Sequence, residues 1–160
     1  GEIVVEETGE AVIRNSHTAG EGGGIFAASV RNAGVLKISN ASAASQGAAV
    51  YAFLSLWSTG ILDITEASSL LGSAVIVQGE LTLIGDTRVA GVVCPGGCAV
   101  AGAGSYLELR NATLEAVEGR HLSWLGTEDA TQVAVVEGVT LQAGEGMSLV
   151  AQNWSVAADC

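Results

Sequence analysis

Apolar and polar residues alternate with a period of two along most of the chain. Leu36-Lys37-Ile38 and Leu62-Asp63-Ile64 are clear examples, and Gly, Asn and Ser flank such segments. This alternation predicts strands with one buried face, separated by turns. No segment keeps an apolar period of 3.6 residues over three turns. The pattern therefore predicts an all-β chain of short strands.

The strands recur at a nearly constant distance along the sequence. Hexads 22–27, 47–52 and 72–77 begin with small residues and continue with a β-branched residue, and a weaker copy follows after a shorter step at Gly91. A regular step of roughly 25 residues predicts a solenoid and is too short for the four strands of a propeller blade. We predict a single-stranded parallel β-helix of about six coils of 19–32 residues, with the glycine hexads at its corners.

A second repeat predicts which residues stack. Its copies begin at Gly34, Gly60, Gly79 and Ser105, so the middle step is shorter than the other two. Stacking these copies gives one outward column and two inward ladders, and it makes Lys37 and Asp63 neighbours on adjacent strands; the glycine hexads give a third ladder. The predicted outward column is Lys37, Asp63, Thr82 and Glu108, and the ladders are Leu36, Leu62, Leu81, Leu107; Ile38, Ile64, Leu83, Leu109; and Ile25, Val50, Val75.

The repeats extend over residues 1–160, which we interpret as one β-helix segment. The chain begins at Gly1 without an initiator Met and ends at Cys160, so we expect an excerpt of a longer protein. Residues 114–134 are predicted to leave the helix as a loop excursion. Open ends of a β-helix expose unpaired strand edges. We expect flanking domains or other protein chains to cover them.

Composition narrows the classes of partner. The net charge is −11, so a nucleic-acid partner is disfavoured because phosphates require a basic face. No apolar run reaches the roughly 18 residues of a membrane helix, so no membrane insertion is expected. The glycine run at 20–24 precedes no Lys-Ser/Thr pair and resembles no phosphate loop. We expect no cofactor and no metal.

Asparagine and cysteine usage indicate a secreted chain. Three of the five asparagines, Asn40, Asn111 and Asn153, begin Asn-x-Ser/Thr triplets, which are acceptors for N-glycans. Cys94 and Cys98 bracket a Pro-Gly-Gly turn and are predicted to form a small disulfide, which leaves the partner of Cys160 open. An extracellular or cell-surface location follows from these features.

The glycine hexads and the asparagines before them carry a resemblance. Residues 15–26 and 40–51 each join an Asn, a seven-residue gap and a Gly-Gly-x-Ile-like motif. This arrangement resembles the repeats of polymorphic outer membrane proteins, although the Phe of that family's Phe-x-x-Asn motif is missing here. The resemblance implies a right-handed β-helix and a cell-surface or adhesive role. It implies no catalytic residues.

Carbohydrate-active enzymes are the main alternative, since many β-helices belong to that class. Glycoside hydrolysis needs two carboxyl groups about 5–10 Å apart. Asp63, Glu108 and Asp86 are the candidates, and stacking places the first two about 10 Å apart with Thr82 between them. His17 and His121 lack neighbouring metal-ligand types. Trp57, Trp124 and Trp154 are candidates for sugar stacking or for gap filling.

These patterns together favour a non-catalytic extracellular module that acts as a rigid spacer or adhesive surface in a larger surface protein or filament. The alternative is a β-helix carbohydrate-active enzyme or carbohydrate-binding module with glycans as partners. A cleft lined by three or more acids and a basic residue would favour the alternative.

Overall fold

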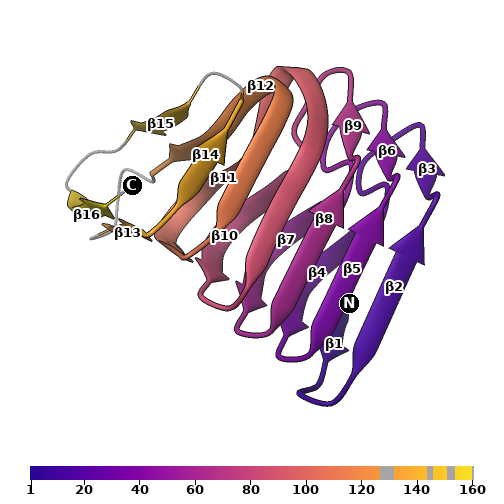
Figure 1. The fold of residues 1–160 in the computed structure, drawn as a ribbon, viewed down its shortest axis with the longest axis horizontal. Coiled ribbons are helices and arrows are strands. Elements are labelled where there is room, and N and C mark those ends of the chain that lie inside the picture. The colour runs from indigo at the N-terminus through magenta and orange to yellow at the C-terminus, as the bar shows by residue number, and fades with distance from the viewer. Residues whose placement is uncertain (127–131, 144–145, 151–153, 160) are drawn as a thin grey trace.

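The protein is a parallel β-solenoid of about five turns in a computed structural model that describes residues 1–126, 132–143, 146–150 and 154–159. Figure 1 shows the strands stacked side by side along one axis, from β1 and β2 at one end to β14, β15 and β16 at the other. All described strands belong to one sheet and every described pairing is parallel. The described part contains no helix, as the alternation predicted.

Three faces and a short corner column make up each coil. Three long strands bend from face 1 onto face 2: β4 (Ile25–Asn32), β7 (Val50–Ser58) and β10 (Val75–Leu83). Face 2 also contains β1 (Glu2–Val5), β13 (Gln132–Glu137) and β16 (Trp154–Asp159), and face 1 ends in β15 (Met147–Val150). Face 3 contains β2 (Glu10–Arg14), β5 (Val35–Ser39), β8 (Ile61–Thr65) and β14 (Thr140–Gln142).

The remaining strands form the corner column or run through several faces. The corner strands are β3 (His17–Thr18), β6 (Ser42–Ala43) and β9 (Ser68–Ser69). The two continuous strands are β11 (Thr87–Arg110), which runs from face 3 around to face 2, and β12 (Thr113–Leu125), which runs from face 3 to face 1.

The glycine hexads are corners of the coil, as predicted. Ile25, Val50 and Val75 pair in register on successive coils, and Val100 continues this ladder. Gly22 has a φ of 65°, which L side chains rarely adopt. A Cβ at Gly22 would also lie 2.6 Å from the Cβ of Phe26. Glycine is therefore required where the chain turns into face 1.

The predicted 19-residue coil is wrong. Paired residues lie 22 to 27 positions apart, and the true continuation of the hexads starts at Gly97 rather than at Gly91. The apparent 19-residue step joined a face 3 strand, β8, to a face 2 strand, β10, because both contain the same alternating apolar motif.

This change of face divides the predicted outward column in two. Lys37 and Asp63 are neighbours on face 3, as predicted, but Asp63 is followed there by Arg88. Thr82 and Glu108 are neighbours on face 2. The Leu81–Leu107 part of the inward ladder likewise belongs to face 2, whereas Leu36 and Leu62 pair on face 3.

The core consists of aliphatic ladders from all three faces. On face 3 the ladder runs through Ile13, Ile38, Ile64, Val89, Leu114 and Leu141. Its four central members are at most 1% exposed. Parallel strands that stack identical side-chain types bury apolar area at every step, so the coils stabilise one another without large aromatic groups.

One aromatic residue interrupts these ladders. Trp124 is 1% exposed and lies in register with Gly102. A Cβ at Gly102 would come within 2.6 Å of the indole, so the missing side chain leaves the space that the ring fills. Trp124 is thus a gap filler and not a surface for sugars.

Residues 114–125 do not leave the helix as an excursion. They belong to β12, which pairs with β11 on one side and with β14 and β15 on the other. Leu114 and Ala116, two alternate residues of β12, are fully buried. Residues 127–131 of the predicted excursion lie outside the described residues.

Candidate functional site

Face 2 presents an outward column that mixes apolar, polar and charged side chains. Its members pair in register in the order Val4, Arg31, Trp57, Thr82, Glu108 and Val135. The side chains of one column point the same way because alternate strand residues share a face. Two groups of contacts form on this face, one around Glu108 and one around Arg31 and Trp57.

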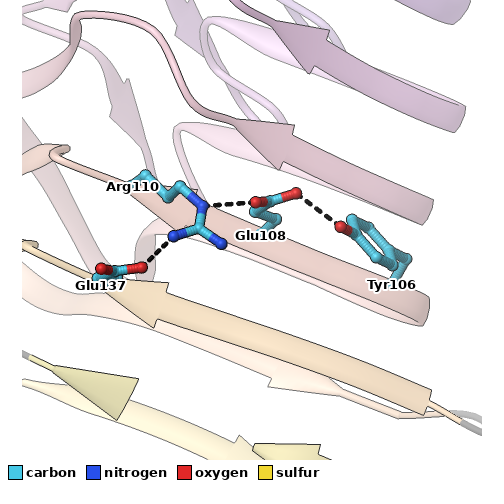
Figure 2. Close-up of polar contacts among 4 residues, drawn as sticks. All are labelled: Tyr106, Glu108, Arg110 and Glu137. Carbon is cyan, nitrogen blue, oxygen red and sulfur yellow. Dashed lines mark hydrogen bonds and ion pairs between the residues drawn. The ribbon is translucent and has the colours of Figure 1, made fainter. Parts of the chain in front are cut away.

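The Glu108 group is a chain of charge-assisted hydrogen bonds. The Tyr106 hydroxyl donates to one carboxylate oxygen of Glu108 at 2.6 Å, and Arg110 Nε donates to the other oxygen at 2.6 Å. Arg110 also donates from its terminal nitrogen to Glu137 on the next coil. Figure 2 shows the four side chains in a row across two neighbouring strands.

This geometry keeps Glu108 ionised. The hydrogen bond from Tyr106, followed by that from Arg110, lowers the pKa of Glu108 from its ordinary value of 4.5. The same bond to Glu108 raises the pKa of Tyr106. Both carboxylate oxygens of Glu108 are engaged, so the group is suited to holding strands together and poorly suited to donating a proton.

The second group contains an arginine that stacks on a ring. The guanidinium carbon of Arg31 lies 4.9 Å from the centroid of the Trp57 ring, which is a cation–π contact. Within the described part of the chain, Arg31 forms no ion pair, whereas Lys37, Arg88 and Arg110 each contact a carboxylate. Arg31 is exposed and Trp57 half-buried.

An open hollow of about 510 Å³ lies beside this stacked pair. Its lining combines two acids, two hydroxyl groups, the Arg31–Trp57 pair and apolar surface: Val4, Val5, Glu6, Glu7, Thr8, Arg31, Ala33, Trp57 and Thr59. The repeat pattern did not predict this hollow, although Arg31 and Trp57 are one 26-residue coil apart and so are expected to be neighbours on adjacent strands.

The carboxylates considered for glycoside hydrolysis are not brought together. Asp63 lies on face 3, where Arg88 approaches it at 3.7 Å, and Glu108 lies on face 2. Asp86 is exposed in the turn between β10 and β11. The expected stacking of Asp63 and Glu108 is therefore wrong, because it assumed that both belonged to one column.

Two of the three glycosylation candidates lie in exposed turns. Asn40 and Asn111 adopt left-handed backbone conformations, with φ of 50° and 55°. Asn40 Nδ2 donates to Oδ1 of Asn15 one coil earlier at 2.8 Å. Asn153 lies outside the described residues. Glycosylation at these positions stays a prediction.

The predicted disulfide between Cys94 and Cys98 is not formed. Both thiols are free and buried. Each packs against the preceding coil, with Cys94 hydrogen-bonded to the backbone of Ser69 and Cys98 to the Ser73 side chain. Burial raises the pKa of Cys94 to about 11 and also raises that of Cys98, so both are poor nucleophiles at neutral pH. Cys160 lies outside the described residues.

The histidines have local partners. His17 Nδ1 lies 2.7 Å from Ser42 Oγ. Buried His121 accepts a hydrogen bond from the Gly146 amide at Nδ1 and donates from Nε2 to the Gln142 carbonyl. It ties β12 to the coil that follows. No group of three or more potential metal ligands occurs among the described residues.

Comparisons with protein families, curated proteins and solved structures found no match to this chain. Among the described residues, no helix is long and apolar enough to span a membrane.

Proposed function

We propose that this chain is a non-catalytic structural and adhesive module, which acts as a rigid spacer or assembly surface in a larger extracellular or cell-surface protein or filament. One observation carries the proposal: the stack of parallel coils is held by hydrogen bonds and aliphatic ladders along its length. Such a stack resists bending and extension because every coil pairs with its neighbours along whole strands.

The surface carboxylates support the non-catalytic part of the proposal. Glu10, Asp63, Glu108 and Glu137 each contact a basic side chain. The contacts of Glu10, Asp63 and Glu137 join adjacent coils, so they contribute to cohesion of the stack. Exposed pairs of this kind contribute about 0–1 kcal/mol each.

The extracellular part of the proposal rests on the sequons and on the repeat motif. Asn40 and Asn111 are exposed, so attached glycans would extend into solvent without disturbing the core. Kinship with polymorphic outer membrane protein repeats is proposed on the Gly-Gly-x-Ile motifs alone. The partners in this role are flanking domains or other chains that pair with the open ends.

Force spectroscopy tests the mechanical role. The chain, held between its two ends, is expected to extend in successive steps as coils are peeled off, each step releasing the length of one coil. A chain that yields at once and without steps under low force would argue against a spacer. Incubation with a panel of polysaccharides tests the catalytic alternative, since newly formed reducing or unsaturated ends would overturn the non-catalytic proposal.

Intact mass spectrometry of the protein secreted from a eukaryotic host tests glycosylation. A mass decrease after removal of N-glycans is expected, and Asn40→Gln and Asn111→Gln should each remove one glycan. An unmodified mass in the secreted protein would overturn this part of the proposal.

A further inference from the structure

The hollow beside Arg31 and Trp57 is lined in part by a turn that is longer than those stacked against it. The turn between β1 and β2, from face 2 to face 3, contains four residues, 6–9. The next two coils turn the same corner with two residues each, 33–34 and 59–60. Three residues of this longer turn, Glu6, Glu7 and Thr8, line the hollow.

Backbone hydrogen bonds hold this longer turn in place. The Gly9 amide donates to the Glu6 carbonyl at 2.8 Å, which closes the turn. The Ala33 amide donates to the Val5 carbonyl at 2.8 Å and anchors the base of the turn to the second coil. Glu6, Glu7 and Thr8 are exposed along it. These three residues line the hollow together with Arg31 and Trp57.

The Arg31–Trp57 contact holds the arginine beside the hollow. A cation–π contact engages the charge of the guanidinium and uses none of its N–H donors. Arg31 has no ion pair among the described residues, so those donors are available to a ligand. Val4, 47% exposed, adds apolar surface beside them.

The fixed charges select the class of ligand. Two carboxylates disfavour an anion, and the guanidinium disfavours a cation in the same hollow. A neutral ligand rich in hydroxyl groups suits both the carboxylates and the guanidinium. Each of its hydroxyl groups can donate to a carboxylate and accept from the guanidinium or from a threonine hydroxyl. The volume of about 510 Å³ is within the usual range for small-ligand sites.

We propose that this hollow binds a neutral sugar unit of a glycan, with Glu6, Glu7 and Arg31 on its hydroxyl groups and Trp57 and Val4 against its apolar C–H surface. The inference rests on the adhesive part of the proposed function, for which it supplies a ligand class. It places the adhesive contact at the β1–β2 end of the solenoid, on face 2.

Saturation-transfer difference NMR with methyl glycosides tests the proposal. The probes are the methyl glycosides of glucose, galactose, mannose and N-acetylglucosamine, with glucuronic acid and glucosamine as charged comparators. At least one neutral glycoside is expected to bind with a dissociation constant in the millimolar range or tighter. Failure of all four neutral probes, or preference for a charged comparator, would overturn the proposal.

Two variants and a matched control locate the binding. Trp57→Ala and Glu7→Gln should each weaken binding at least tenfold. Phe26→Ala removes an exposed ring from face 1, outside the hollow, and should leave binding unchanged. Equal loss in Phe26→Ala and Trp57→Ala would place the sugar elsewhere and refute the site.

Circular dichroism and urea unfolding of the same proteins separate the two proposals. Glu7 is exposed in a turn, so Glu7→Gln should retain the wild-type unfolding midpoint. This variant therefore tests the site even if Trp57→Ala destabilises face 2. A stable rod that binds no glycoside would reject the sugar site alone. Loss of the stepwise extension described above would reject the spacer.

Discussion

Two arginines on face 2 have opposite surroundings. Arg110 lies between Glu108 and Glu137, and its charge is neutralised within the surface. Arg31 lies on the Trp57 ring beside an open hollow, with no ion pair among the described residues. The backbone under both is the same stacked strand register. The closed patch consists of Tyr106, Glu108, Arg110 and Glu137, and the open patch of Arg31, Trp57 and the hollow beside them. The two patches are only three coils apart on one repetitive scaffold. They differ in their outward side chains and in the length of one turn.

Core truncation tests whether the scaffold beneath the two patches is equivalent. Leu56→Ala next to Trp57 and Leu107→Ala next to Glu108 each remove a side chain that is fully buried. Each should lower the free energy of unfolding by about 2–5 kcal/mol, measured by urea denaturation. If one of the two variants hardly lowers the free energy of unfolding, its coil is loosely packed and the scaffold beneath the two patches is not equivalent.

Removing the Glu108 carboxylate should break the hydrogen-bond chain of the closed patch and lower the stability of the fold. Glu108→Ala deletes the acceptor for Tyr106 and Arg110, and the expected loss of stability is about 1–3 kcal/mol because both bonds are charge-assisted. Urea unfolding at neutral pH measures it. Thr82→Ala, one coil earlier in the same column, is the control and should cost less. Equal losses would mean that the hydrogen-bond chain contributes nothing specific.

The Glu108 carboxylate should also make the stability of the fold depend on pH. The pKa of Glu108 is lower in the folded protein than its ordinary value of 4.5, so the folded state favours the ionised form. Its contribution is present above pH 4.5 and is lost as the pH falls through the lowered value. Unfolding midpoints measured from pH 7 to pH 3 should fall less steeply in Glu108→Gln than in the wild type. Identical acid slopes would contradict the assignment.

Changing Arg31 should have the smallest effect on folding. A cation–π contact at an exposed site contributes about 0.5–1 kcal/mol, so Arg31→Gln should hardly move the unfolding midpoint. Tryptophan fluorescence should nevertheless change, because the guanidinium leaves the Trp57 ring. A stability loss as large as that of Glu108→Ala would show that the open patch is a structural contact after all.

The sequence pattern predicted the architecture because stacking repeats each side-chain type at a fixed interval. Ile25, Val50 and Val75 were placed in one ladder, and Lys37 beside Asp63, from spacing alone. The same pattern misplaced Thr82 and Glu108. An alternating motif looks alike on every face, so it identifies a strand but not the face to which the strand belongs.

The cysteines show a second limit of spacing. Cys94 and Cys98 flank a turn, which predicted a disulfide, yet each thiol packs against a serine of the coil beneath. In a solenoid the nearest neighbours of a corner residue come from the adjacent coil as well as from its own turn, as the pairing of Val93 with Ser68 shows.

The sequence by itself determined the all-β solenoid, its regular period and its glycine corners, because backbone geometry and the burial of aliphatic side chains act locally and repeat. Only the tertiary structure decided which strand lies on which face, that Arg110 contacts two carboxylates, and that Arg31 and Trp57 border an open hollow. These properties depend on register between coils and on the length of single turns. A shift of one face in that register changes every surface neighbour while leaving the hydrophobic pattern intact.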